Sequence, residues 1–90
     1  MTQAVLPGED LVRAGLDDLA RGVESIPALL VSIGAPRLRR LGVQVPAPIP
    51  SPERRLYEVL HGADPATAHS RYNALVRRLV SFERAAECAR

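Results

Sequence analysis

A chain of 90 residues with 47% hydrophobic and 24% charged residues is one small domain, which excludes a disordered polar tail, a collagen-like repeat and a disulfide scaffold. The formal net charge is +2, and all 12 basic residues are Arg, a bias typical of high-GC codon usage that makes Arg content alone a weak indication of nucleic-acid binding. With the single cysteine Cys88, no leader-like start and no run of about 20 apolar residues, the chain is expected to be cytoplasmic and without a membrane segment.

The N-terminal part, residues 1–42, is predicted to form a helical hairpin. Apolar residues recur at steps of three and four from Val12 to Val23, which predicts a helix over about residues 9–21 with Gly22 as its C-terminal cap. Most of the acids of residues 1–35 lie in this segment, whereas residues 36–90 carry the surplus of Arg.

A second helix is expected to start at Ser25, because Ser is a good N-cap and Pro27 fits a first helical turn. Its apolar stripe comprises Ile26, Leu29, Leu30 and Ile33. Pro36 would clash with the carbonyl of Ser32, so we expect the helix to break or kink near residues 34–36. A short helical turn over residues 37–41, ended by Gly42, would follow.

Residues 43–52, here called the strap, contain four prolines and are expected to be extended and polyproline-like. The strap would separate two helical hairpins. It is either a stiff spacer, or a segment that lies across a partner or across the other half of the chain.

The C-terminal part, residues 53–90, is predicted to be a second helical hairpin. Its first helix would begin with Ser51 as N-cap and Pro52 in the first turn, and would end at Gly62. Asp64 and Pro65 form the same combination of N-cap and first-turn proline, and they would begin a long last helix over about residues 65–88. The predicted fold is therefore all-α, with about four helices in two hairpins joined by the strap.

The last helix carries a heptad pattern of apolar residues, with steps of four and three: Ala68, Tyr72, Leu75, Leu79, Phe82, Ala86 and Ala89. This seam either packs into the chain's own small core or pairs with another chain. Arg77, Arg78 and Arg84 fall on the opposite side of the helical wheel.

No catalytic, cofactor-binding or metal-binding constellation is expected, so the chain is predicted not to be an enzyme. His61, His69 and Cys88 are too scattered for a metal site. Asp17 and Asp18 are adjacent in a helix and point about 100° apart.

A helix-turn-helix DNA-binding regulator is the alternative function. The short turn at residues 62–64 fits it, and the recognition helix would then begin with Thr67, His69, Ser70, Arg71 and Asn73. The low net charge argues against this function, as does the poor sharing of one face by Thr67, Arg71 and Asn73.

A protein-binding module is the favoured function, because each predicted helix has an apolar face while a chain of this length buries little. The partner is another protein or a second copy in a homodimer. The expected contact residues are the seam and nearby arginines: Tyr72, Leu75, Leu79, Phe82, Arg71, Arg77 and Arg78.

Four strings, residues 16–19, 26–30, 37–42 and 70–75, resemble those of small actinobacterial helical proteins encoded beside nucleotidyltransferase toxins. Members of that group are the antitoxins of toxin–antitoxin systems. The resemblance implies that the chain binds a toxin enzyme directly and sterically inhibits its transfer of nucleotides to tRNA. No catalytic residue is carried over.

Overall fold

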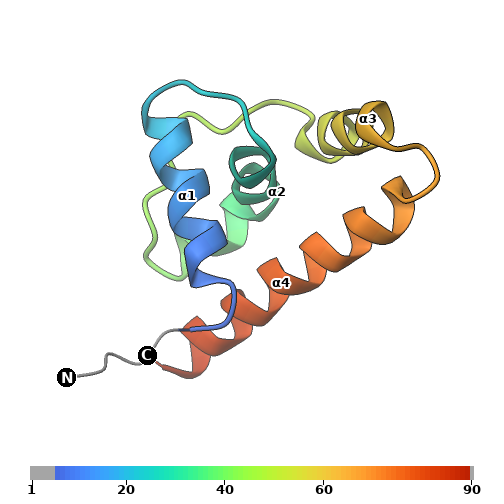
Figure 1. The fold of residues 1–90 in the computed structure, drawn as a ribbon. Coiled ribbons are helices and arrows are strands. Elements are labelled where there is room, and N and C mark those ends of the chain that lie inside the picture. Colours follow the sequence, from blue (N-terminus) through green and yellow to red (C-terminus); the bar gives the residue numbers. More distant parts are fainter. Residues whose placement is uncertain (1–5, 90) are drawn as a thin grey trace.

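The fold is all-α, as predicted, and the computed structural model describes residues 6–89 of it. Four helices make up this part of the chain, without a strand (Figure 1): α1 (Glu9–Ala20), α2 (Ile26–Arg40), α3 (Pro52–Ala63) and α4 (Ala68–Cys88). Two hairpins, α1–α2 and α3–α4, are joined by the strap, whose last residue begins α3. The molecule measures 40 × 25 × 24 Å.

The turn between α1 and α2 follows the predicted signals. Gly22, with φ 70°, ends α1 in the left-handed conformation that favours glycine. Ser25 caps α2, since its Oγ accepts a hydrogen bond from the N–H of Ala28 at 3.1 Å. The same hydroxyl donates to Asp18 Oδ2 at 2.6 Å, which links the two helices and lowers the pKa of the Asp18 carboxyl below its ordinary value.

The expected break near Pro36 is wrong, because α2 continues through this proline to Arg40. Pro36 is exposed, so its ring lies on the solvent side of the helix. Residues on both sides of it, including Val31 and Leu38, are fully buried, so the helical turns before and after the proline are both packed in the core. Tertiary packing here outweighs the local preference of proline to end a helix.

The strap does not hold the hairpins apart, because α2 packs against α1, α3 and α4. One hydrophobic cluster contains buried residues of all four helices and of the strap: Val12, Leu19, Ala28, Leu29, Leu30, Val31, Ala35, Leu38, Val45, Leu56, Leu60, Ala68, Leu79 and Phe82. Helix α2 lies at the centre of this core, and four consecutive residues, 28–31, are completely buried. Residues 26–35 of α2 contain no charged side chain, which suits this part of the helix to the centre of a core.

Residues 43–51 are non-helical, but the expectation of an extended, polyproline-like strap is met only in part, because Ala47 (φ 33°) and Ser51 (φ 48°) have left-handed backbone. The strap folds back on the N-terminal hairpin. Arg39 Nη2 donates to the carbonyl oxygen of Val45 at 2.9 Å, and the N–H of Ile49 donates to Ser32 Oγ at 3.0 Å. Val45 itself is buried in the core. The strap is therefore pinned at two points to α2 rather than spanning free space between the hairpins.

The ends of α3 and α4 differ in detail from the prediction. Ser51 occupies the N-cap of α3 but makes no capping hydrogen bond, since its φ of 48° is far from the extended backbone of a capping residue. Helix α3 ends one residue after Gly62. Asp64 forms a separate turn by accepting hydrogen bonds from the N–H of Ala66 and the hydroxyl of Thr67, so α4 starts only at Ala68.

Candidate protein interface

The predicted heptad seam of α4 lies against the chain's own core for most of its length. Leu79 and Phe82 are only 3% and 7% exposed, and Ala68 is completely buried. Tyr72 and Leu75 are partly buried against the same cluster. Of the expected apolar contact residues, Tyr72 and Leu75 therefore keep accessible surface in this fold, while Leu79 and Phe82 are core residues.

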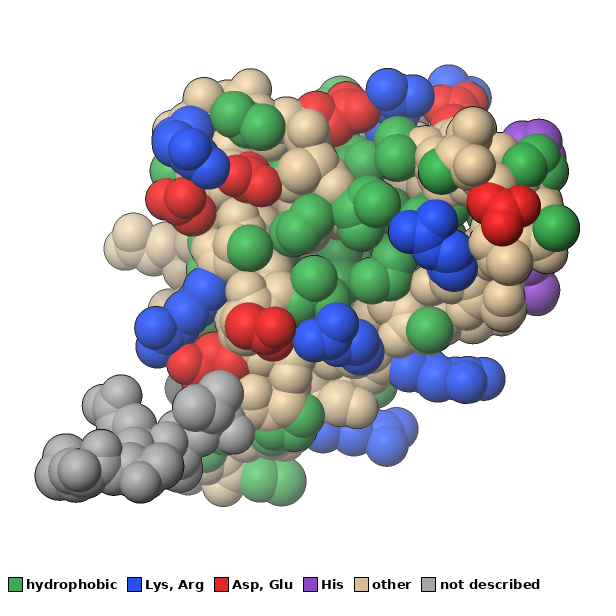
Figure 2. Space-filling view, in the orientation of Figure 1, with side chains coloured by type: hydrophobic (Ala, Val, Ile, Leu, Met, Phe, Trp, Pro, Cys, Tyr) green, Lys and Arg blue, Asp and Glu red, His purple; other side chains and the backbone are tan. Residues whose placement is uncertain are grey.

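The expectation that a chain of this length would bury little of its apolar helix faces is largely wrong. Among residues 6–89, only two large hydrophobic side chains are classed as exposed: Val23 at 43% and Tyr57 at 39%. The reason is the central position of α2, which covers the apolar faces of the other three helices. Figure 2 shows the apolar side chains that remain accessible on one face gathered over α2, between α1, α3 and α4, with charged groups around them.

Three side chains form an aromatic corner on the C-terminal hairpin: Tyr57, His61 and Tyr72. The rings of Tyr57 and His61 are stacked one helical turn apart on α3, with centroids 6.1 Å apart. The ring of Tyr72, on α4, meets that of Tyr57 edge-on at 6.2 Å. The corner therefore joins the two helices of the hairpin through rings, of which those of Tyr57 and His61 are exposed.

The two tyrosines of the corner differ in environment. Burial raises the pKa of the Tyr72 hydroxyl above its ordinary value of 10.0, and the negative charge of Glu53 adds to this shift. Tyr72 is therefore a neutral, half-buried support, whereas Tyr57 presents a large apolar ring and a hydroxyl to the outside. Rings of this kind at a surface are characteristic anchors of protein interfaces.

The three arginines expected to contact a partner lie in different settings. Arg78 pairs with Asp10 of α1 at 3.3 Å, so it contributes to an ion pair within the chain. Arg71 and Arg77 are exposed. Arg71 immediately precedes Tyr72 in α4, which makes it the cation nearest in sequence to the aromatic corner.

Tyr57 was not among the contact residues expected from the sequence. A local signal existed, because Tyr57 and His61 are four residues apart and so face each other on a helix. The meeting of Tyr57 with Tyr72 depends on how α3 packs against α4, which the sequence pattern does not specify.

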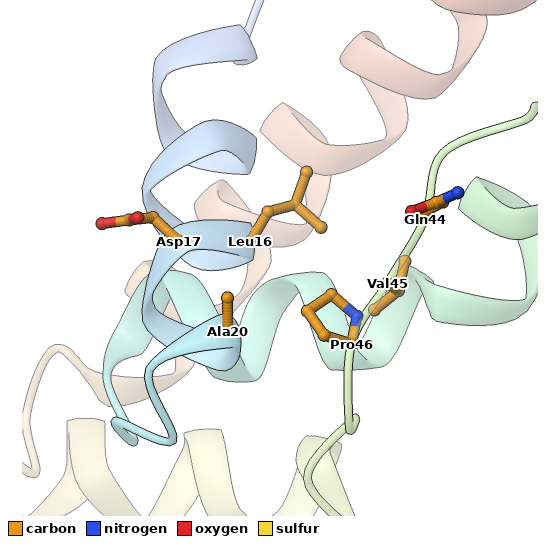
Figure 3. A pocket seen from close by; sticks show the side chains of 6 residues that line it. All are labelled: Leu16, Asp17, Ala20, Gln44, Val45 and Pro46. Carbon is orange, nitrogen blue, oxygen red and sulfur yellow. The ribbon is translucent and has the colours of Figure 1, made fainter.

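A crevice between α1 and the strap is the second apolar surface. It consists of two hollows in succession, of about 600 and 320 Å³. Figure 3 shows the larger one, where Leu16 and Ala20 of α1 face Val45 and Pro46 of the strap. The smaller hollow extends to Val23. No aromatic side chain lines either hollow, so the crevice lacks the anchor that the corner has.

The residues of the alternative recognition helix are brought together only in part. His69 and Asn73 share a hydrogen bond of 3.2 Å across one turn of α4. Thr67 lies before the helix, and its hydroxyl is engaged by Asp64. Ser70 and Arg71 are exposed.

No protein-family model, curated protein or solved structure matches this chain. In the described part of the sequence, no three His, Cys, Asp or Glu side chains are grouped so that they could hold a metal ion. Between residues 6 and 89, no helix combines the length and apolar character needed to cross a membrane.

Proposed function

We propose that this chain is a protein-binding module and that the aromatic corner is its contact surface. The observation that carries the proposal is the exposed ring of Tyr57, which is held by His61 on one side and by Tyr72 on the other. Both supports are fixed in helices, so the ring loses little conformational freedom when a partner covers it. Preorganised aromatic residues of this kind carry a large share of the free energy of binding at protein interfaces.

The partner that we propose is a toxin enzyme, in line with the resemblance of residues 16–19, 26–30, 37–42 and 70–75 to antitoxins. Tyr57 would enter an apolar pocket at the rim of the enzyme's substrate groove, with Tyr72 at its base. Arg71 would pair with an acidic group beside the pocket. Such docking inhibits by steric exclusion of the tRNA end and needs no catalytic group on this chain.

The test compares two substitutions at the two exposed large hydrophobic residues, Tyr57→Ser and Val23→Ser. The gene next to that of this chain is first inspected for a nucleotidyltransferase-like reading frame, whose absence would contradict the proposed partner. Its product is then purified, and its binding to each variant is measured by calorimetry. A hot-spot residue is worth about 2 kcal/mol or more, so Tyr57→Ser should weaken binding about 30-fold. Val23→Ser, at the far end of the α1–strap crevice, should bind as the parent does.

Inhibition of nucleotide transfer to tRNA should decline in parallel with binding. Circular dichroism confirms that each variant is folded. The proposal fails if the parent does not bind that enzyme, or if Tyr57→Ser binds it as tightly as the parent. It also fails if Val23→Ser, rather than Tyr57→Ser, abolishes the complex, because the crevice would then be the contact surface.

A further inference from the structure

One face of α4 points away from the rest of the molecule and carries two arginines. This outer face comprises Ser70, Asn73, Arg77, Ser81 and Arg84, which follow one another at steps of three or four residues. At 100° per residue these five positions span about 80° of the helix. All of them are exposed except Asn73, which is half-buried.

The acids of α4 are turned away from this outer face. Glu83 and Glu87 are the only carboxylates of the helix, and both contact Arg37 of α2, at 3.5 and 3.4 Å. Within residues 6–89, no carboxylate lies within ion-pair distance of Arg77 or Arg84. By contrast, Arg13, Arg21, Arg54, Arg55 and Arg78 each have an acidic partner. The positive charge of the outer face is thus not neutralised inside the chain.

The chemistry of the outer face suits phosphate better than a protein surface. Its other polar side chains are two hydroxyls and one amide, all able to donate hydrogen bonds. The exposed Ala74 and Cys88 on the same side of the helix are small. It has no large apolar or aromatic residue, and protein interfaces usually need such a residue at their centre. Interfaces with nucleic acid are instead polar and positively charged, and many of their hydrogen bonds go to phosphate oxygens.

The spacing along the helix agrees with a nucleic-acid backbone. Arg77 and Arg84 are seven residues apart, which is a rise of about 10.5 Å. Phosphates on one strand of a duplex advance by about 3.4 Å each, so the two guanidinium groups can reach phosphates about three nucleotides apart.

We propose that the outer face of α4 binds the phosphodiester backbone of a nucleic acid without reading its base sequence. This binding is separate from the contact surface around Tyr57, because Tyr72 and Arg77 point about 140° apart on α4. A protein partner and a nucleic acid can therefore occupy the chain at the same time.

The test is fluorescence anisotropy of the full chain with labelled duplex DNA, duplex RNA and single-stranded RNA of equal length. Two phosphate contacts predict a slope of log K against log salt of about −1.8 for duplex DNA. Affinity should then fall about 12-fold between about 50 and 200 mM salt. Sequence-scrambled duplexes should bind equally well, and the comparison of DNA with RNA shows which backbone is preferred.

The double variant Arg77→Ser/Arg84→Ser removes both contacts and should weaken duplex binding at least about tenfold, with a slope near zero. The control Arg13→Ser/Arg54→Ser removes the same total charge from exposed side chains of α1 and α3 and should bind like the parent. Equal weakening by both double variants would overturn the proposal, because the affinity for duplex DNA would then depend on the total charge of the chain and not on the outer face. Absence of salt-dependent binding would also overturn it, as would tighter binding of polyglutamate than of duplex DNA, because the ligand would then be an acidic protein.

Discussion

Two glycines in helices occupy opposite environments, and they show at the scale of a single residue how tightly the hairpins pack. A Cβ added at Gly15 of α1 would lie 2.5 Å from Val31 Cγ2 and 2.8 Å from the carbonyl carbon of Pro27, on α2. A Cβ added at Gly62 of α3 would have no neighbour within 4 Å. The first glycine is required by close helix approach, whereas the second is not.

Gly15→Ala should therefore destabilise the protein by about 3 kcal/mol, because backbone atoms of Pro27 cannot move aside. Gly62→Ala should stabilise it by about 0.5–1 kcal/mol, since Ala restricts the unfolded chain and favours a helix. Urea unfolding followed by circular dichroism measures both changes. An unchanged midpoint for Gly15→Ala would show that α1 and α2 lie farther apart than described.

Glu83 is a buried carboxylate whose ionisation opposes folding. Burial raises the pKa of the Glu83 carboxyl above its ordinary value of 4.5, and the attraction of Arg37 and Arg40 offsets only part of this rise. The folded state therefore keeps a proton that the unfolded state releases. The free energy of unfolding consequently falls as pH increases from 4.5 through the raised pKa.

Glu83→Gln should remove this pH dependence. The variant should be more stable than the parent at about pH 7, and the difference should vanish below pH 4.5, where both states of the parent are protonated. Glu87→Gln removes the exposed carboxylate that contacts the same Arg37, and it should change stability by less than about 1 kcal/mol. A parent that is more stable than Glu83→Gln at neutral pH would show that the ion pair outweighs desolvation.

The two serines at the N-caps of α2 and α3 should differ in their contribution to the free energy of unfolding. Ser25→Ala removes the capping bond to the N–H of Ala28 and the bond to Asp18, and should cost about 1 kcal/mol. Ser51 makes no capping bond, and its φ of 48° strains any residue with a Cβ. Ser51→Gly should therefore stabilise the protein by about 1 kcal/mol.

Thermal unfolding of the two serine variants provides the measurement, because their midpoints should shift in opposite directions. A loss of stability in Ser51→Gly would indicate that the hydroxyl of Ser51 has a role as a cap after all. A neutral Ser25→Ala would indicate that water replaces the capping bond at the start of α2.

Sequence signals located the elements because caps, glycines and prolines act locally. Gly22 and Ser25 bounded the first turn correctly, and the prolines of the strap excluded a helix there. The continuation of α2 through Pro36 was missed, because that outcome depends on contacts of Val31 and Leu38 with other helices. The start of α4 was placed three residues early, since Asp64 caps a turn rather than the helix itself.

The candidate site could be predicted only in part, because it too depends on how the helices pack against one another. Tyr72 and Arg71 were selected from the heptad pattern and its neighbouring charges, and both keep accessible surface. Leu79 and Phe82 show the same pattern but are buried, because a heptad step does not distinguish a chain's own core from that of a partner. Tyr57 became a candidate only through its contact with Tyr72 across the hairpin.

At the scale of the whole molecule, the shared core predicts that the two hairpins unfold together. Leu30 of α2 and Leu56 of α3 belong to one cluster, and Val45 of the strap is buried in it. Separating residues 53–90 from the remainder would expose the faces that α2 covers. A small chain with one core is expected to unfold in a single cooperative transition.

The position of the aromatic residues allows this cooperativity to be tested. Both tyrosines lie on the C-terminal hairpin, so tyrosine fluorescence reports on that hairpin, whereas circular dichroism reports on all four helices. Urea unfolding followed by both signals should give the same midpoint and the same slope. A fluorescence transition at a lower urea concentration than the loss of helicity would mean that α3 and α4 detach first, with α2 left as the core of an independent N-terminal unit.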